Sequence, residues 1–326
     1  MEKFRWCIIG AGALAKSVAE EILASGRHEI TSVYSRRMES SVDYVAKYGG
    51  KAFANVEEAI SQDNVDGVYI VTPHTSHHEY SLLALNLDKP VLNEKPFTVN
   101  AKETKEILDL ARAKNIYIAE AMWTWFAEGP HKVKSWIDAG ELGDISKAEL
   151  IYTMNTTDPD SRIVDPARAG GGLLDIGVYP ITYLYRLFGY PTDIKAEGVV
   201  ENGIDLSETI YLTFSNGLEA KITVAINDPA QREELLIEGN LGKIDLPGYH
   251  HTAHANLERN DGSVEHFTGA AGYLNQFDIV ADEIRRGLLE SEKVPHQATY
   301  DVMKIMDECR RQIDLVYPGE TLADLS

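Results

Sequence analysis

Three side chains of this sequence have the types and positions needed to move a proton. Lys95 lies in Glu94-Lys95-Pro96, directly after a short apolar run, and Asp175 and Tyr179 stand four residues apart after Gly170-Gly171-Gly172. A spacing of four puts two side chains on one face of a helix. A phenol has a pKa of about 10, which is too high for efficient base catalysis at neutral pH, but a nearby ammonium favours its ionised form. The three residues are therefore candidate catalytic residues, although Asp175 could instead stabilise a helix start and Tyr179 could be part of the core.

The first 34 residues contain a candidate nucleotide site. Phe4–Ile9 is a mostly apolar run typical of a buried parallel strand, and Gly10-Ala11-Gly12-Ala13-Leu14-Ala15 follows it directly. We expect a helix over residues 16–25 and a second strand over residues 30–34. In this strand–turn–helix–strand context the pattern G-x-G-x-x-A predicts that a pyrophosphate lies on bare backbone at the helix start. The alternative is an ordinary strand-to-helix turn that happens to contain glycines.

The residues after the second strand bear on which dinucleotide is bound. An acid there would accept hydrogen bonds from the adenosine ribose, whereas an arginine would pair with a 2′-phosphate. This sequence has Ser35-Arg36-Arg37 and no acid, which favours NADP(H), with NAD(H) as the alternative. Arg36 is the stronger candidate of the two arginines, since Arg37 could be an ordinary surface side chain.

Further candidate cofactor contacts follow two later strands, expected at residues 67–71 and 90–93. Ligands of open parallel sheets bind beyond the carboxyl ends of the strands. His74 and His77 could equally be polar loop and helix-start residues without contact to a ligand. The full set of expected cofactor contacts is Gly10, Gly12, Ala13, Leu14, Ser35, Arg36, Arg37, Thr72, Pro73, His74, His77, Glu94, Lys95 and Pro96.

The order of elements predicts an α/β protein with two domains. Strands and helices alternate as far as residue 121, which indicates a doubly wound parallel sheet of the Rossmann type and a dinucleotide-binding domain over residues 1–121. From residue 122 to 326, β-biased stretches and the hairpin signal Asn216-Gly217 predict an α+β domain for substrate binding and dimerisation, with a large, mostly antiparallel open sheet. The expected substrate contacts are Trp123 on a crevice wall, the more buried Phe126, and Arg162.

Composition excludes several kinds of partner. The 326 residues carry 31 basic and 51 acidic side chains, a formal net charge of −20, which opposes binding to nucleic acid or to anionic membranes. No apolar run is long enough to cross a bilayer, and the two cysteines are far apart in the sequence, so we expect a cytoplasmic protein. The run His250-His251-Thr252-Ala253-His254 lacks the carboxylate of a zinc-protease motif, and we expect no metal site.

Taken together, four motifs resemble the Gfo/Idh/MocA oxidoreductases over essentially the whole chain. They are Gly10-Ala11-Gly12, Thr72-Pro73, Glu94-Lys95-Pro96 and residues 170–179. Within that family the sequence is most similar to the branch of dimeric dihydrodiol dehydrogenases and NADP-dependent D-xylose dehydrogenases, which have tyrosine at the position of Tyr179. The resemblance implies a cis peptide between Lys95 and Pro96 and a homodimer formed through the second sheet. Relatives usually have arginine where this chain has Trp125, which leaves the substrate open.

The residues and the resemblance together predict an NAD(P)-dependent dehydrogenase acting on CH–OH donors. The expected reaction is hydride transfer between the nicotinamide and a secondary alcohol of a sugar, polyol or trans-dihydrodiol, with the carbonyl as substrate in reverse. An inositol or other polyol dehydrogenase that uses NAD is the closest alternative. A non-catalytic NAD(P)-binding regulator is a more distant one, because it would not need Lys95, Asp175 and Tyr179 together.

Overall fold

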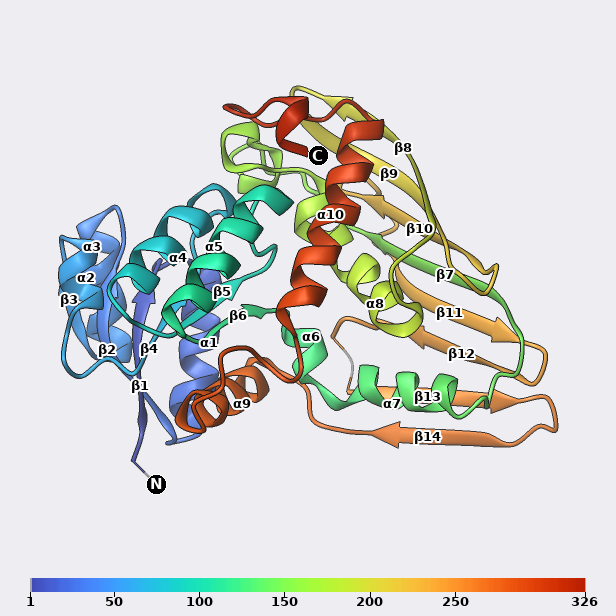
Figure 1. Ribbon diagram of the computed structural model, residues 1–326, viewed down its shortest axis with the longest axis horizontal. Coiled ribbons are helices and arrows are strands. Elements are labelled where there is room, and N and C mark those ends of the chain that lie inside the picture. Colours follow the sequence, from blue (N-terminus) through green and yellow to red (C-terminus); the bar gives the residue numbers. More distant parts are fainter. Residues whose placement is uncertain (1, 252, 326) are drawn as a thin grey trace. The chain divides into compact units, whose positions relative to one another are not determined.

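The computed structural model describes residues 2–251 and 253–325, which form two compact units (Figure 1). The first unit comprises Met1–Thr98, Glu103–Phe126 and Gly272–Thr299, and the second comprises Val99–Lys102, Ala127–Ala271 and Tyr300–Ser326. The parallel sheet belongs to the first unit and the larger sheet to the second, so both predicted sheets are present.

The first unit is built on a six-stranded parallel sheet with the strand order β3-β2-β1-β4-β5-β6. The strands are β1 (Phe4–Ile9), β2 (His28–Tyr34), β3 (Lys51–Phe53), β4 (Gly67–Ile70), β5 (Val91–Glu94) and β6 (Ile118–Ala121). The strand order reverses between β1 and β4, which is where doubly wound sheets bind their ligands. The predicted Rossmann-type sheet is confirmed.

Helices connect these strands at positions close to those expected. They are α1 (Ala13–Ala24), α2 (Met38–Tyr48), α3 (Val56–Ile60), the 3₁₀ turn η1 (His74–Ser76), α4 (His77–Asn86), α5 (Ala101–Lys114) and α6 (Trp123–Phe126). Helix α1 begins at Ala13, three residues before the expected start, because Gly12 already serves as its N-cap. Strand β6 begins two residues later than expected, at Ile118.

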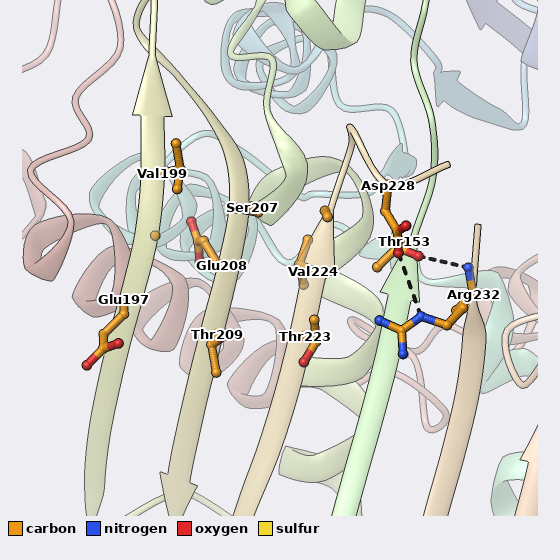
Figure 2. Close-up of a pocket in the computed structure, with 12 residues that line it drawn as sticks. Thr153, Glu197, Val199, Ser207, Glu208, Thr209, Thr223, Val224, Asp228 and Arg232 are labelled. Carbon is orange, nitrogen blue, oxygen red and sulfur yellow. Dashed lines mark hydrogen bonds and ion pairs between the residues drawn. The ribbon is translucent and has the colours of Figure 1, made fainter. Parts of the chain in front are cut away.

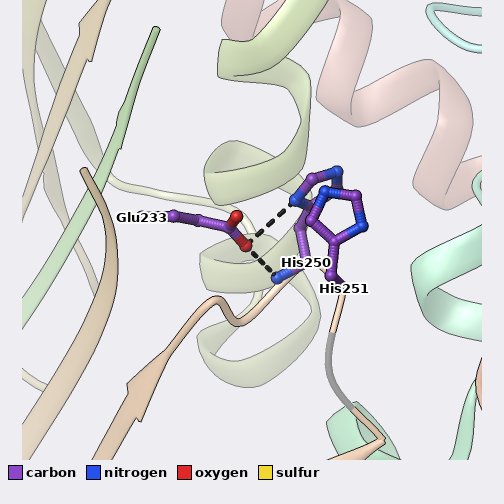
Figure 3. Close-up of side chains that lie close together, drawn as sticks. All are labelled: Glu233, His250 and His251. Carbon is purple, nitrogen blue, oxygen red and sulfur yellow. Dashed lines mark hydrogen bonds and ion pairs between the residues drawn. The ribbon is translucent and has the colours of Figure 1, made fainter. Parts of the chain in front are cut away.

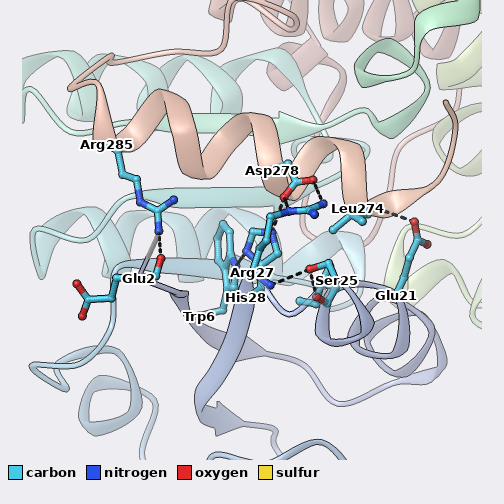
Figure 4. Close-up of polar contacts among 10 residues, drawn as sticks. Glu2, Trp6, Glu21, Ser25, Arg27, His28, Leu274, Asp278 and Arg285 are labelled. Atoms are coloured by element: carbon cyan, nitrogen blue, oxygen red, sulfur yellow. Dashed lines mark hydrogen bonds and ion pairs between the residues drawn. The ribbon is translucent and has the colours of Figure 1, made fainter. Parts of the chain in front are cut away.

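Helix α9 (Tyr273–Arg285) packs within the first unit, although it lies far along the chain (Figure 4). Its Phe277 ring lies 5.0 Å from the ring of Trp6, and Asp278 pairs with Arg27 and, at 3.1 Å, with the ring of His28. This helix follows the sequence division at residue 121, and its return to the first domain was one of two packings left open. The buried face formed by Phe277, Val280 and Ala281 explains this packing, because it is covered by the first unit's own residues.

The second unit contains an eight-stranded sheet with the order β14-β13-β12-β11-β7-β10-β9-β8. Its strands are β7 (Ile145–Thr153), β8 (Asp193–Glu201), β9 (Ile204–Thr213), β10 (Glu219–Ala225), β11 (Glu233–Gly239), β12 (Gly242–Pro247), β13 (His254–Arg259) and β14 (Val264–Thr268). All pairs are antiparallel except β7 with β10. The mostly antiparallel sheet is confirmed, and β12 to β14 were not foreseen.

The hairpin between β9 and β10 is present, with a loop longer than the two residues that Asn216-Gly217 suggested. The Gly217 N–H donates to the carbonyl of Phe214, and the Phe214 N–H donates to the carbonyl of Leu218. Gly217 has a φ of +84°, and Asn216 has no positive φ. This is a three-residue loop in which the glycine takes the left-handed position.

The large sheet has one apolar face and one polar face. Alternate residues such as Leu150, Ile222 and Ile237 are buried, and helices α7 (Glu128–Asp138) and α8 (Val178–Phe188) contact that side. The short turns η2 (Arg162–Val164), η3 (Pro166–Arg168), η4 (Leu173–Gly177) and η5 (Leu322–Leu325) and the helix α10 (His296–Gln312) complete the described elements. The opposite face carries a shallow hollow of about 500 Å³ over β7 to β11, lined by residues that include Thr209 and Thr223 (Figure 2).

Two carboxyl groups on β9 are buried beneath the sheet. Asp205 and Glu208 are at most 2% exposed, and burial raises the pKa of both above its usual value. The neighbouring Asp205 carboxyl raises the pKa of Glu208 further, while the charge of the fully buried Arg310 acts in the opposite direction. Arg310 is itself engaged by Glu320 and by the Val99 carbonyl at 2.7 Å, so it offsets the two acids only in part. Glu208 is consequently a proton-binding group of the folded state.

This pair makes the stability of the fold depend on pH. A carboxyl whose pKa is raised on folding binds more protons in the folded than in the unfolded chain, so stability falls as pH rises above about 4.5, the ordinary pKa of glutamate. We expect Glu208→Gln, which cannot ionise, to raise the melting temperature at pH 8 and to change it much less at pH 5.

Thermal unfolding followed by circular dichroism at the two pH values measures this effect. Glu197→Gln is the matched control, because Glu197 is exposed on the neighbouring strand β8. An equal shift in melting temperature at pH 5 and pH 8 for Glu208→Gln would contradict the assignment.

Candidate functional site

The first unit presents an open backbone cradle where β1 meets α1. Gly10 has a φ of +111°, and a Cβ there would lie 2.5 Å from the carbonyl oxygen of Val71. Only glycine can therefore make this turn beside the end of β4. A Cβ on Gly12 would have no atom within 4 Å, and Gly12 is the N-cap of α1 without a side-chain cap. The backbone at Gly12 is thus open to an anion, and Ala15 is buried against the sheet as the pattern requires.

The residues expected around a cofactor's adenosine end are accessible. Gly12 and Ala13 are exposed and Leu14 is half-buried at the start of α1. Ser35 is half-buried, and the side chains of Arg36 and Arg37 are exposed after β2. Neither guanidinium forms an ion pair with an acid in the part of the chain that the structure describes. Both arginines therefore remain available to an anionic ligand.

The loops after β4 and β5 are tied together by a histidine. His77 is fully buried, with Nδ1 2.9 Å from the carbonyl oxygen of Pro96 and Nε2 3.0 Å from that of Thr72. Its ring therefore links the two loops that carry the other expected contacts, and its own contact with a cofactor stays a prediction. His74 is also buried, with its ring 5.8 Å from that of His77. The peptide between Lys95 and Pro96 is cis, as the resemblance implied.

Lys95 stands at the end of β5 among acidic and phenolic groups of the first unit. Glu94 accepts a hydrogen bond from the Tyr69 hydroxyl at 2.6 Å. Burial raises the pKa of Glu120 to about 7, with a contribution from Glu94, and the charge of Lys95 opposes that rise. Burial also raises the pKa of Tyr273, which Lys95 again opposes. The ammonium thus favours the ionised forms of Glu120 and Tyr273.

The two aromatic residues expected near the substrate lie in α6, and their contact with a substrate stays a prediction. Trp123 and Phe126 are both buried, and the Trp123 ring lies 5.2 Å from the ring of Tyr273. Because Tyr273 is the first residue of α9, a segment far along the chain adds to these aromatic residues. The sequence analysis did not assign Tyr273 to the site, and its position after Gly272 gave no signal for it.

In the second unit, Asp175 is held by Arg162. The Arg162 guanidinium donates to Oδ1 of Asp175 at 2.7 Å, with the aspartate side chain 6% and the arginine 42% exposed. Arg162 comes from the turn η2, and Asp175 from the π-helical turn η4. The sequence analysis named both residues but did not pair them, because a loop contact over 13 positions has no periodic signature.

The triple glycine before Asp175 serves close packing. A Cβ on Gly171 would lie 1.9 Å from Oδ1 of Asp205, and one on Gly170 would lie 2.4 Å from the carbonyl oxygen of Ile163. The Leu173 N–H donates to the other carboxyl oxygen of Asp205 at 2.6 Å. The glycines therefore let the backbone approach Asp205 and the η2 loop, which fixes the start of the helical segment carrying Asp175.

Tyr179, in the first turn of α8, is packed against two polar aromatic residues that the sequence analysis did not assign to it. The His250 ring lies 4.8 Å and the Tyr152 ring 5.9 Å from the Tyr179 ring. Glu233 Oε1 lies 2.9 Å from Nδ1 of His250 (Figure 3). Alternation along β7 would have placed Tyr152 on the buried face, but nothing local in the sequence brings His250 to it.

Glu233, His250 and His251 also bring three potential metal-ligand atoms within 4.8 Å of one another. The contact between Glu233 and His250 is that of an ordinary ion pair, which accounts for their proximity without a metal. His251 is exposed, and Thr252 of the predicted histidine run lies outside the described residues. His254 is on β13, where Nδ1 contacts the Thr268 hydroxyl at 3.0 Å. The absence of a metal site remains a prediction.

Comparisons with known proteins agree with this geometry. Residues 4–121 match the model of an oxidoreductase family with an NAD-binding Rossmann fold, and residues 131–245 match the C-terminal domain of the same family, GFO/IDH/MocA. No helix among the described residues is long and apolar enough to span a membrane.

Individual relatives cover almost the whole chain. The NADP(+)-dependent scyllo-inositol 2-dehydrogenase of Bacillus subtilis is 30% identical over 97% of this chain and 99% of its own. The NADP(+)-dependent D-xylose 1-dehydrogenase of Hypocrea jecorina is 28% identical over 98% of this chain and 95% of its own. The aldose-aldose oxidoreductase of Caulobacter crescentus has the same fold, with a TM-score of 0.87 at 18% identity over 96% and 98% of the two chains. With its cradle, its two sheets and these relatives, the chain belongs to the Gfo/Idh/MocA family of oxidoreductases.

Proposed function

We propose that the protein transfers hydride between NADP(H) and a secondary alcohol of a sugar, polyol or diol. The observation that carries the proposal is the open cradle at Gly12 followed by two unpaired arginines after β2, with no acid at that strand end. Relatives named as NADP(+)-dependent inositol and xylose dehydrogenases and as trans-1,2-dihydrobenzene-1,2-diol dehydrogenases support the substrate class. An inositol or polyol dehydrogenase that prefers NAD is the alternative.

The first unit would hold the cofactor. Backbone N–H groups at Gly12, Ala13 and Leu14 would receive the pyrophosphate, because no side chain of Gly12 stands in the way. Arg36 would pair with a 2′-phosphate. Because the net charge of the protein repels anions, a local cation is needed to hold this phosphate. When bound, the nicotinamide supplies the hydride chemistry, and the protein supplies position and electric field.

Side chains of the protein would accept and return the proton of the substrate hydroxyl. In the oxidative direction Tyr179 accepts the hydroxyl proton of the substrate as hydride leaves the adjoining carbon, and in reduction it returns that proton. Lys95 would favour the phenolate of Tyr179 and stabilise negative charge developing on the substrate oxygen. Asp175, kept ionised and oriented by Arg162, would accept a hydrogen bond from a substrate hydroxyl. Arg162, being half exposed, also offers a donor to a polar substrate group.

We further infer a cytoplasmic homodimer that forms through the polar face of the large sheet. The hollow over β7 to β11 is lined by hydroxyl side chains such as Thr209 and Thr223 together with charged ones that include Arg232, and by Val199, which is 50% exposed. This composition suits contact with a second copy better than a fully charged surface would. Cys7 and Cys309 are both buried free thiols, in keeping with a reducing compartment.

Substitution of Gly10 should affect mainly the stability of the fold, and substitution of Gly12 mainly the binding of the cofactor. Gly10→Ala places a Cβ against the Val71 carbonyl at positive φ, so we expect a melting temperature several degrees lower. Gly12→Ala adds a methyl group in open space at an ordinary φ of −78°, so its melting temperature should match the wild type.

Titration of NADPH fluorescence with the Gly12→Ala protein measures the second effect. We expect its dissociation constant to rise about tenfold or more, because the methyl group occupies the space meant for the pyrophosphate. An unchanged dissociation constant would remove Gly12 from the cofactor site.

Lys95 and Arg36 should affect different kinetic constants. Lys95→Met removes the ammonium but keeps the length of the side chain, so we expect turnover to fall by orders of magnitude while NADPH binding stays nearly intact. Arg36→Ala should raise the KM for NADPH about tenfold, leave the KM for NADH nearly unchanged, and preserve turnover at saturation.

Steady-state kinetics with both cofactors and a panel of polyols, pentoses and diols provides these constants. Normal turnover in Lys95→Met would exclude the proposed mechanism. Equal losses with NADH and NADPH in Arg36→Ala would favour the NAD-dependent alternative.

The proposed dimer can be tested by light scattering. The wild type should scatter with the mass of two chains, and the double variant Thr209→Arg/Thr223→Arg with the mass of one. The introduced arginines of one copy would face and repel those of the other copy across the interface. Ser61→Arg, at an exposed position of the first unit, is the control and should leave the mass unchanged. A wild-type mass of one chain at micromolar concentration would rule out the dimer.

A further inference from the structure

His250 lies between two phenol rings in the core of the second unit. Its ring centroid is 4.7 Å from that of Tyr152 and 4.8 Å from that of Tyr179, and the residue is 6% exposed. The orientation of the Tyr179 ring therefore depends on where the imidazole lies, since packed aromatic rings leave each other little freedom.

Polar contacts fix the His250 ring at both nitrogens. Glu233 Oε1 lies 2.9 Å from Nδ1 and also accepts the backbone N–H of His250 at 2.6 Å. The Tyr152 hydroxyl lies 3.2 Å from Nε2. A carboxylate only accepts, so its position beside Nδ1 favours a proton on that nitrogen, and Nε2 shares a hydrogen bond with the Tyr152 hydroxyl. These contacts hold the imidazole in one rotation.

The sheet register builds this chain of contacts. Tyr152 on β7 is the direct cross-strand partner of Glu233 on β11, and both point to the face that α8 covers. The loop after β12 returns to the same place, where the Gly248 N–H donates to the Glu233 carbonyl at 2.8 Å. Three separate segments therefore meet beside Tyr179.

A purely structural core would not need a charge at this point. Burial alone would raise the pKa of Glu233, but its hydrogen bond to His250 and the attraction between them outweigh burial and lower that pKa below its usual value. A largely buried carboxylate costs free energy that an apolar residue at position 233 would avoid, and without His250 that carboxylate would lack its partner. The polar chain is thus retained at a cost in stability where it touches a proposed catalytic residue.

We propose that Glu233, His250 and Tyr152 form a hydrogen-bonded chain that positions the Tyr179 phenol for proton transfer. This inference rests on the proposed function, in which Tyr179 exchanges a proton with the substrate. His250 and Glu233 act through Tyr179 and are positioning residues. The chain orients the His250 ring, and that ring in turn sets the plane of the phenol.

The test is a double-mutant cycle on the full-length protein loaded with NADP. Glu233→Gln keeps the acceptor for the backbone N–H but removes the charge, and His250→Phe keeps a flat ring but removes both nitrogens. Each single variant should lower the single-turnover rate of hydride transfer about ten- to hundredfold, since small misplacements of a reacting group have effects of that size. The double variant should be no slower than the slower single variant, because both changes break one chain.

Two further measurements keep a folding defect apart from a positioning effect. The dissociation constant for NADPH should stay unchanged in every variant, and Tyr183→Phe, which removes a buried hydroxyl one turn further along α8, should have the wild-type rate. Multiplying losses in the double variant, or a wild-type rate in His250→Phe, would overturn the positioning role. Inactivation by a chelator that zinc reverses would also overturn it, since it would make Glu233 and His250 metal ligands.

Tyr179→Phe separates this inference from the function on which it rests. A rate lower by orders of magnitude in Tyr179→Phe together with a normal rate in His250→Phe refutes the positioning chain alone. A normal rate in Tyr179→Phe refutes the proposed proton transfer itself.

Discussion

The close approach of Gly10 to the end of β4 is the constraint on which the cofactor cradle depends. With a φ of +111° and the Val71 carbonyl oxygen where a Cβ would be, the chain turns sharply as it leaves β1. That turn places Gly12 at the N-terminus of α1 with open space above it. The parallel order of β1, β4 and β5 then brings Thr72 and Lys95 to the same edge of the sheet. A bulkier residue at position 10 would separate these elements.

The second unit keeps several polar groups ordered inside an apolar layer. Arg162 compensates Asp175, His250 compensates Glu233, and Asp205 accepts the backbone N–H of Leu173. Burial nevertheless raises the pKa of Asp205 and of its neighbour Glu208, so the protonated forms of this pair are favoured. Two of these groups, Asp175 and His250, belong to the surroundings of the proposed proton transfer, so the cost of burying polar atoms there also serves to hold them in place.

Local signals in the sequence predicted the first unit well and the second only in outline. Apolar runs and glycine spacing predict the strand β1, the helix α5 and the turn at Gly10. Each of these signals lies within a short stretch of sequence. Strands β12 to β14 were missed because their sequence, with Asp245, Asn256 and Glu258 among the apolar residues, has weak β-propensity. These strands form by successive pairing, β12 with β11, β13 with β12 and β14 with β13. Helix α9 was recognised as a helix, but whether it packs on the second sheet or returns to the first domain stayed open, since the surface that covers Phe277 is not encoded nearby.

The same distinction explains which parts of the candidate site could be foreseen. Lys95 and Gly12 follow strand ends, and sheet topology alone gives them a role. Arg162 reaches Asp175 through an irregular loop, and His250 reaches Tyr179 only once β7, β11 and β12 are in register. Groups that bind the part of a cofactor common to many enzymes can thus be fixed by short motifs, whereas groups that tune one proton depend on contacts between distant segments. Relatives that share the fold would then differ in substrate because of the residues brought together from distant segments. Exchange of a single aromatic residue among them changes both the shape and the polarity of the site.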